Sequence, residues 1–137
     1  MQQPFLLDTC AALRVVSGIL PQKAADALTE AHRDGVPIYV SPITAWEVGI
    51  LARKGRFRSP LSPPRWFEAL MAKPGTVLAE ITPRILMDSS FLPGDFHLDP
   101  GDQIIAATAR EFGFTVMTRD RALLDYAVQG HLRAVEC

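Results

Sequence analysis

The order of apolar segments along this chain predicts an α/β fold, a three-layer α/β/α sandwich with a central, mainly parallel sheet. Short apolar runs rich in β-branched and aromatic residues alternate with segments whose apolar residues recur every three or four positions. Strands that alternate with helices are typical of a parallel sheet covered on both faces. The chain has 137 residues, of which 48% are hydrophobic. We therefore expect residues 1–137 to form a single domain around its own core.

The first half of the chain is expected to contain two strands and three helices. The first strand is the apolar run Phe5-Leu6-Leu7, which is too short for a helix and ends at Asp8. A later helix starts at Ser41-Pro42, because serine caps free N–H groups and proline fits the first helical position. Its expected apolar face consists of Ile43, Trp46, Ile50 and Leu51. In chain order, we expect strand, helix, helix, strand and helix at residues 5–7, 9–18, 22–34, 36–40 and 42–55.

The second half continues the alternation after a connector at residues 59–64, where three prolines stand among serines. Its clearest helix begins at Asp102 and ends at Gly113. The expected buried stripe of that helix consists of Ile104, Ile105, Thr108, Ala109 and Phe112. In chain order, we expect a helix, strand, helix, loop, helix, strand, helix and edge strand at residues 66–73, 76–81, 83–91, 93–101, 102–112, 114–117, 121–127 and 132–135.

The apolar segments and the cysteines indicate the cellular compartment of the protein. No apolar run approaches the roughly 20 residues that cross a membrane, and the segment from Met1 to Pro4 lacks the basic start of a signal peptide. Cys10 and Cys137 form neither a close pair nor a metal-binding spacing, which favours reduced thiols. These features predict a cytoplasmic protein.

The net charge of −1 does not by itself favour or exclude nucleic acid as a partner. One short stretch is nevertheless free of acidic residues and carries Arg53, Lys54, Arg56, Arg58 and Arg65. Such a stretch can contact the phosphates of RNA, and it can equally be an ordinary solvated loop.

Acidic residues are expected at the carboxyl edge of the sheet, where open parallel sheets place their sites. Asp8 follows the first strand, and Asp120 follows the strand expected at residues 114–117. Asp102 starts the helix that leads into that strand, and Glu47 lies one to two turns into the helix after the second strand. Each aspartate has a plainer interpretation as a helix cap, whereas a glutamate in the apolar surroundings of residue 47 needs a partner.

Carboxylates brought together in this way require a counter-charge. Two of them about 4 Å apart repel each other by roughly 4 kcal/mol at an effective dielectric constant of 20. Such a cluster either binds protons or binds a divalent cation, and oxygen ligands suit Mg²⁺ or Mn²⁺ better than zinc.

Four blocks in this order resemble the PIN-domain ribonucleases, and among them the VapC-type toxins of bacterial toxin–antitoxin pairs. The blocks are Leu6-Leu7-Asp8-Thr9, Trp46-Glu47-Val48-Gly49, the segment from Asp99 to Ala109, and Thr118-Arg119-Asp120. The resemblance implies a PIN-like fold in which Asp8, Glu47, Asp102 and Asp120 are the catalytic, metal-binding acids. It implies supporting positions at Thr9, Asp99 and Thr118. One departure is Gln103, where many relatives have arginine.

The same resemblance implies an endoribonuclease that uses Mg²⁺ or Mn²⁺ to hydrolyse RNA and leaves a 5′-phosphate and a 3′-hydroxyl. It also implies an antitoxin that covers the site, and a homodimer to which the helix around Trp46 and Ile50 could contribute. RNA contacts would come from Arg53, Lys54, Arg56 and Arg58.

Two other functions remain open. In a non-catalytic module that binds RNA or protein, the acids would serve only as caps. A phosphohydrolase with Asp8 as nucleophile is disfavoured, because Cys10 stands where the haloacid-dehalogenase pattern has a second acid.

Overall fold

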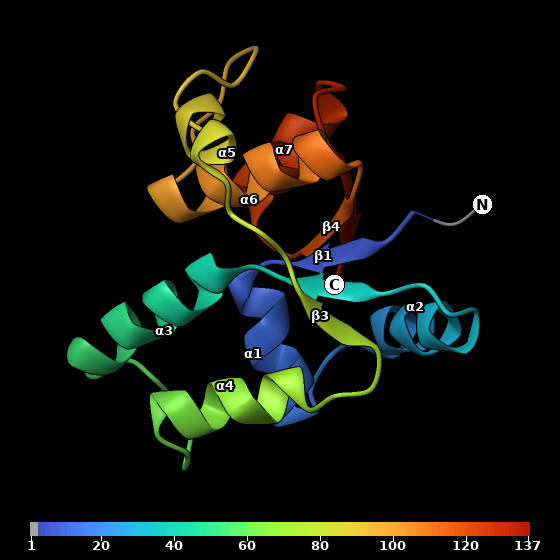
Figure 1. Ribbon diagram of the computed structural model, residues 1–137, viewed down its shortest axis with the longest axis vertical. Coiled ribbons are helices and arrows are strands. Elements are labelled where there is room, and N and C mark those ends of the chain that lie inside the picture. The colour runs from blue at the N-terminus through green and yellow to red at the C-terminus, as the bar shows by residue number, and fades with distance from the viewer. Residues whose placement is uncertain (1–2) are drawn as a thin grey trace.

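The computed structural model describes residues 3–137 and places one five-stranded sheet between two layers of helices (Figure 1). Met1 and Gln2, where the segment inspected for a signal peptide begins, lie outside the described residues. The strands are β1 (Phe5–Leu7), β2 (Ile38–Val40), β3 (Thr76–Leu78), β4 (Thr115–Thr118) and β5 (Arg133–Glu136). The helices are α1 (Thr9–Ser17), α2 (Gln22–Arg33), α3 (Pro42–Arg53), α4 (Pro63–Met71), α5 (Pro83–Asp88), α6 (Pro100–Phe112) and α7 (Arg121–Val128).

The strand order is β3-β2-β1-β4-β5, and every neighbouring pair is parallel. The chain builds outward from β1 to β2 and β3 on one side, and then crosses to β4 and β5 on the other side. The direction of strand order therefore reverses between β1 and β4. The carboxyl ends of two such strands bound the crevice in which open α/β sheets usually bind their ligands.

Each face of the sheet has its own core because successive side chains of a strand point to opposite faces. Phe5 and Leu7 pack with residues of α1, α2, α3 and α4, whereas Leu6 packs with residues of α5, α6 and α7. Figure 1 shows the same division, with the sheet between the two groups of helices. The predicted α/β/α sandwich is confirmed, and Leu6, Leu7 and Val40 are almost fully buried.

Two helix starts differ from the prediction because prolines begin helices here. α4 begins at Pro63 rather than at residue 66, with Ser62 capping its first turn, so the connector ends earlier than expected. α6 begins at Pro100 rather than at Asp102, so the loop before it ends two residues earlier than expected. Proline lacks an N–H group, and the first turn of a helix does not need one.

The ends of β3 and α5 were also predicted too late. β3 ends at Leu78 rather than at residue 81, and α5 ends at Asp88 rather than at residue 91. Apolar residues continue past both ends and contact the core from loops instead, as Ala79 and Leu92 do.

Two aromatic residues predicted on the apolar faces of helices are exposed. Trp46 is 56% exposed, and the buried residues of α3 are Thr44 and Val48 instead. Phe112, at the last position of α6, is 44% exposed. Trp66 is buried as expected of a core residue. Within residues 3–137, no helix is long and apolar enough to cross a membrane.

Candidate active site

Asp8 stands directly after β1 and caps the start of α1. Its Oδ1 atom accepts a hydrogen bond of 2.8 Å from the backbone N–H of Ala11, and its Oδ2 atom accepts one from the Thr118 hydroxyl. Only 2% of its surface is exposed. The carboxylate is therefore buried and held at both oxygens.

Thr118 and Asp120 approach from the neighbouring strand β4. The backbone N–H of Asp8 donates to the carbonyl oxygen of Met117 at 3.2 Å, which places the two strand ends side by side. The Thr118 hydroxyl donates to Asp8 and accepts a hydrogen bond of 2.9 Å from the backbone N–H of Asp120. Asp120 caps α7 by accepting from the N–H of Leu123 at 3.0 Å.

Glu47 reaches the same edge from the second turn of α3. The Thr9 hydroxyl donates to its Oε1 atom at 2.6 Å. On its other side lies Gly101, where an added Cβ would stand 2.7 Å from the Glu47 Cδ atom and 2.8 and 2.9 Å from its two oxygens. The Glu47 carboxylate thus lies between the start of α1 and the first turn of α6.

Asp102 is in the first turn of α6, and its carboxylate accepts no hydrogen bond from residues 3–137. Asp99 is exposed at the N-cap position, and its side chain makes no capping bond. Gln103 donates from Nε2 to the carbonyl oxygen of Leu98 at 3.1 Å. The residue that departs from the family pattern therefore holds the loop before α6.

Burial and mutual repulsion raise the pKa of three of these acids. Loss of solvent is the largest cause for Asp8, Glu47 and Asp102. Hydroxyl hydrogen bonds from threonines oppose the rise in the pKa of Asp8 and of Glu47. For Asp102, burial and then the nearby charges, of which Asp120 and Glu47 are the largest, raise the pKa from 3.8 to about 7. The acids are thus close enough to repel one another.

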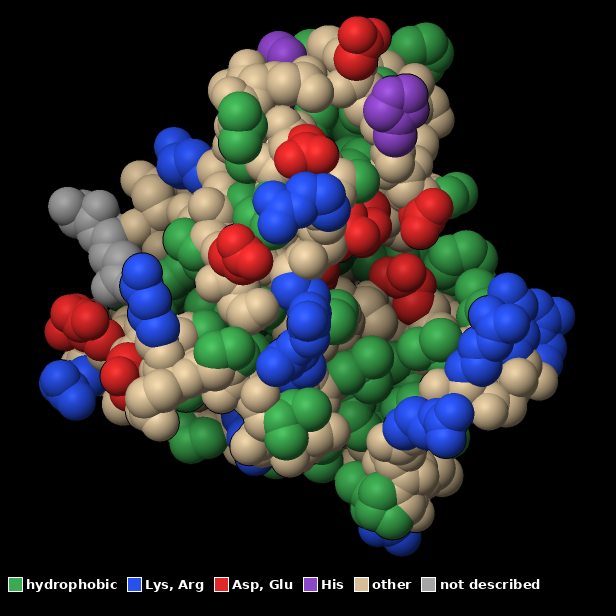
Figure 2. All heavy atoms as spheres, turned by 180° about the vertical axis from the view of Figure 1, so that it is seen from behind, with side chains coloured by type: hydrophobic (Ala, Val, Ile, Leu, Met, Phe, Trp, Pro, Cys, Tyr) green, Lys and Arg blue, Asp and Glu red, His purple; other side chains and the backbone are tan. Residues whose placement is uncertain are grey.

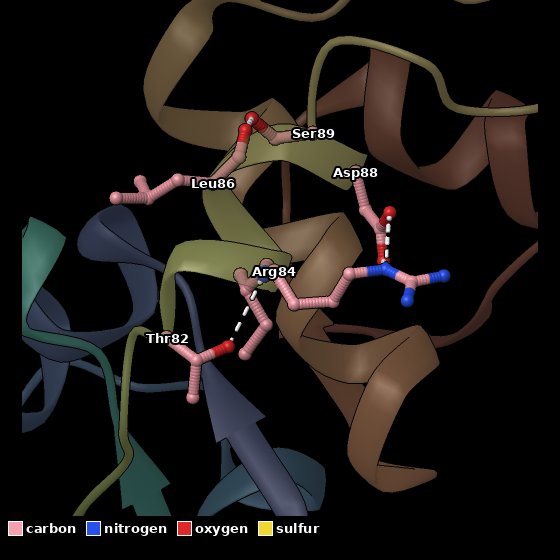
Figure 3. Close-up of polar contacts among 6 residues, drawn as sticks. Thr82, Arg84, Leu86, Asp88 and Ser89 are labelled. Atoms are coloured by element: carbon pink, nitrogen blue, oxygen red, sulfur yellow. Dashed lines mark hydrogen bonds and ion pairs between the residues drawn. The ribbon is translucent and has the colours of Figure 1, made fainter.

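No arginine or lysine within residues 3–137 forms an ion pair with these carboxylates. The ion pair present in this part of the chain joins Arg84 Nε to Asp88 Oδ1 at 3.0 Å. It lies along the exposed side of α5, whose first turn is capped by Thr82 (Figure 3). The negative charge at the sheet edge is therefore not neutralised by side chains of the described part of the chain.

The donor set at this edge suits a hard divalent cation, because all its donor atoms are carboxylate oxygens or hydroxyls. Across residues 3–137, no three Asp, Glu, His or Cys side chains stand close enough to hold one ion as they are arranged here. A bound ion would therefore have to draw these side chains together. The acids predicted to form the site are Asp8, Glu47, Asp102 and Asp120, and all four lie along this edge.

The face that carries the acids is hollowed. Figure 2 shows acidic side chains gathered around a hollow to the right of centre, and basic side chains at the right edge, where the end of α3 lies. The side chains of Arg53, Lys54, Arg56 and Arg58, which we call the basic arm, are exposed. Arg65, at the start of α4, is exposed as well.

Two residues of this region were not identified from the sequence. Thr44 is fully buried, and its hydroxyl lies 3.2 Å from the Thr9 hydroxyl. Gly101 leaves the space that the Glu47 carboxylate occupies. The spacing of Thr44, three residues before Glu47 on the predicted helix, was a usable signal. Nothing in the sequence marked Gly101 apart from its place before Asp102.

Comparison with known families and proteins shows what this chain is similar to. The family model described as "PIN domain" matches residues 5–129. Among curated proteins, Ribonuclease VapC22 of Mycobacterium tuberculosis is 32% identical over 103 residues, which cover 75% of this chain and 78% of that protein.

Solved structures with the same fold include a DNA-bound protein and a toxin–antitoxin complex. VapBC2 from Rickettsia felis, bound to a DNA fragment from its promoter, aligns with a TM-score of 0.71 and 13% identity, over 97% of this chain and 98% of the other. A toxin–antitoxin complex from Klebsiella pneumoniae aligns with a TM-score of 0.59 and 25% identity, over 95% of this chain and 94% of the other.

Proposed function

We infer that this chain, which belongs to the PIN domain family, is a metal-dependent endoribonuclease and the toxin of a toxin–antitoxin pair. The observation that carries the proposal is the set of acids at the β1/β4 switch point, which no arginine or lysine in residues 3–137 neutralises. Similarity to a ribonuclease over three quarters of the chain supports RNA as the substrate. We propose that residues 1–137 act as one nuclease domain.

In this proposal Asp8, Glu47, Asp102 and Asp120 hold Mg²⁺ or Mn²⁺. A divalent cation bound there would lower the pKa of a coordinated water and stabilise the leaving oxygen, giving a 5′-phosphate and a 3′-hydroxyl. The supporting residues act on the acids themselves. Thr118 orients Asp8, Thr9 orients Glu47, and exposed Asp99 adds negative charge near the site.

The basic arm is proposed to contact the RNA. Arg53, Lys54, Arg56 and Arg58 are exposed at the end of the helix that carries Glu47. Phosphates held there would bring a neighbouring phosphodiester toward the acidic edge, and this attraction weakens as salt concentration rises.

Protein partners are proposed from the relatives. A protein with the same fold was solved as a toxin–antitoxin complex, which supports an antitoxin that covers the carboxylates, for instance with an arginine placed among them. A homodimer is proposed through the exposed side of α3, where Trp46 and half-buried Ile50 offer apolar surface. An RNA substrate and free thiols at Cys10 and Cys137 suit the cytoplasm.

The test is isothermal titration of Mn²⁺ into wild type and Asp8→Asn, with RNA cleavage measured in parallel. Asparagine can still cap α1, so the variant is expected to fold, to lose cleavage down to background and to bind Mn²⁺ much more weakly. Asp125→Asn, at an exposed position of α7, is the matched control and should behave as wild type.

The alternatives give different results. If the wild type binds RNA but does not bind Mn²⁺ and does not cut RNA, it is a binding module whose acids are helix caps. Metal-loaded Asp8→Asn with substantial cleavage would remove Asp8 from the proposed site.

A further inference from the structure

We propose that Thr44 is a positioning residue for Glu47 and acts through the hydroxyl of Thr9, a role that rests on the proposed nuclease function. The three side chains form a chain of contacts that joins α3 to the start of α1. Thr44 and Thr9 are 3.2 Å apart between hydroxyl oxygens, and Thr9 is 2.6 Å from Glu47 Oε1. Thr44 has no exposed surface.

The direction of these hydrogen bonds follows from counting hydrogens. A hydroxyl donates one hydrogen, and the Thr9 hydrogen goes to the Glu47 carboxylate, which can only accept when ionised. The Thr9 oxygen must therefore accept from Thr44, so Thr44 is the donor in the 3.2 Å contact. This donation fixes the rotation of the Thr9 hydroxyl and aims its hydrogen at Glu47.

The Thr44 hydroxyl differs from those of Thr29 and Thr108, two other threonines inside helices. Thr29 donates to the carbonyl of Ala25 at 3.0 Å, and Thr108 donates to that of Ile104 at 2.7 Å, both within their own helices. That local bond is the ordinary choice of a helical threonine. Thr44 instead contacts a residue 35 positions earlier in the chain.

The two hydroxyls hold the Glu47 carboxylate in a place that leaves it little room to move. The Glu47 carboxylate lies so close to Gly101 that a Cβ atom at residue 101 would overlap it. Its charge is among the causes of the raised pKa of Asp102, so the two acids are neighbours. A shift of the Glu47 carboxylate therefore changes the spacing of the pair that a cation would bridge.

The experiment compares five variants by Mn²⁺ titration and RNA cleavage. Thr44→Val keeps the shape and removes the hydroxyl, whereas Thr44→Ser keeps the hydroxyl. Thr108→Val is the matched control, because it removes an equally buried hydroxyl that bonds only to its own helix. Thr9→Val, alone and combined with Thr44→Val, tests whether Thr44 acts through Thr9.

Thr44→Val is expected to weaken Mn²⁺ binding about tenfold, as residues that orient metal ligands typically do. Thr44→Ser and Thr108→Val should bind as wild type does. In the Thr9→Val background, the added Thr44→Val change should have no further effect. Equal affinities for Thr44→Val and Thr108→Val, or an undiminished loss in the Thr9→Val background, would overturn the proposal.

Crystal structures of the metal-free proteins separate this inference from the proposed function. Wild type that binds no Mn²⁺ contradicts the nuclease proposal, yet the placement of Glu47 can still be compared. In Thr44→Val the carboxylate should leave the contact with Gly101, and in Thr44→Ser it should remain. If it stays in place in Thr44→Val, Thr44 does not position it. Should Thr44→Val fail to fold, Thr44→Ala replaces it in both experiments.

Discussion

The acids of the candidate site fall into two pairs that the fold treats differently. Asp8 and Asp120, which we call the capped pair, accept backbone N–H bonds at the starts of α1 and α7. Glu47 and Asp102, the open pair, make no cap: the Glu47 carboxylate accepts from one threonine hydroxyl, and the Asp102 carboxylate accepts no hydrogen bond from residues 3–137. Burial and the charges of nearby acids raise the pKa of Asp102 to about 7.

The difference shows how one sheet edge serves two purposes. The capped pair stabilises two helices and should remain in place whether or not a cation is bound, because each carboxylate accepts a backbone N–H bond at a helix start. The open pair is destabilising while ionised, since its members are partly buried near other carboxylates. A bound divalent cation would therefore act mainly on the open pair.

The largest effect is expected from Gly101→Ala, which tests how narrowly the open pair is placed. The new Cβ would overlap the Glu47 carboxylate, which is the flexible end of a side chain and can move away. Folding should therefore be preserved, while Mn²⁺ affinity and cleavage should fall tenfold or more, in the range seen for changes that disturb metal ligands.

Gly49→Ala is the matched control for this change. Gly49 is an exposed helical glycine with nothing within 4 Å of the added Cβ. Alanine there should raise the free energy of unfolding by about 0.5–1 kcal/mol and leave cleavage unchanged. If both glycine variants cleave RNA as the wild type does, the contact between the Glu47 carboxylate and Gly101 does not matter for cleavage.

A smaller effect on the free energy of unfolding should distinguish the capping role of Asp120 from the uncapped position of Asp102. Replacing Asp120 with alanine should lower the free energy of unfolding by about 1 kcal/mol relative to asparagine, because asparagine can still cap α7. At Asp102, alanine should be at least as stable as asparagine, since there is no cap to lose. Urea unfolding in EDTA at pH 7.5 measures both differences.

Both replacements at Asp102 should also make the metal-free protein more stable than wild type. They remove a carboxylate that burial and nearby acids disfavour. The capped and open pairs would not be distinct if alanine were less stable than asparagine at Asp102, or if the two variants were equally stable at Asp120.

Much of this arrangement could be predicted from the sequence because it depends on local patterns. Asp8 and Asp120 follow short apolar strands, and the parallel order of elements brings the ends of such strands to one edge. Caps such as Ser41 mark helix starts in the same local way. The predicted fold class and the family were confirmed on this basis.

The placement of the open pair could not be predicted in detail from the sequence. The place of Glu47 depends on Thr9, Thr44 and Gly101, which come from three different helices. Contacts between helices depend on how the layers pack, which no local pattern encodes. The same reason explains why Trp46 is exposed although it lies on the predicted apolar face, since packing against α4 and α6 sets which face of α3 is buried.

The smallest expected effect is a pH dependence of stability that comes from the open pair. The folded pKa of Asp102, about 7, is above its unfolded value near 3.8, so between these pH values the folded state binds more protons than the unfolded state does. The contribution of Asp102 to stability is therefore greatest below pH 4 and is lost as pH rises to about 7. In EDTA, the melting temperature of wild type relative to Asp102→Asn should fall by several degrees over this range. Saturating Mn²⁺ should reverse the trend above pH 7, because the cation binds the ionised acids and stabilises the folded state. An unchanged difference between wild type and Asp102→Asn from pH 5 to pH 8 would mean that Asp102 ionises normally, and the open pair would then need no cation to neutralise it.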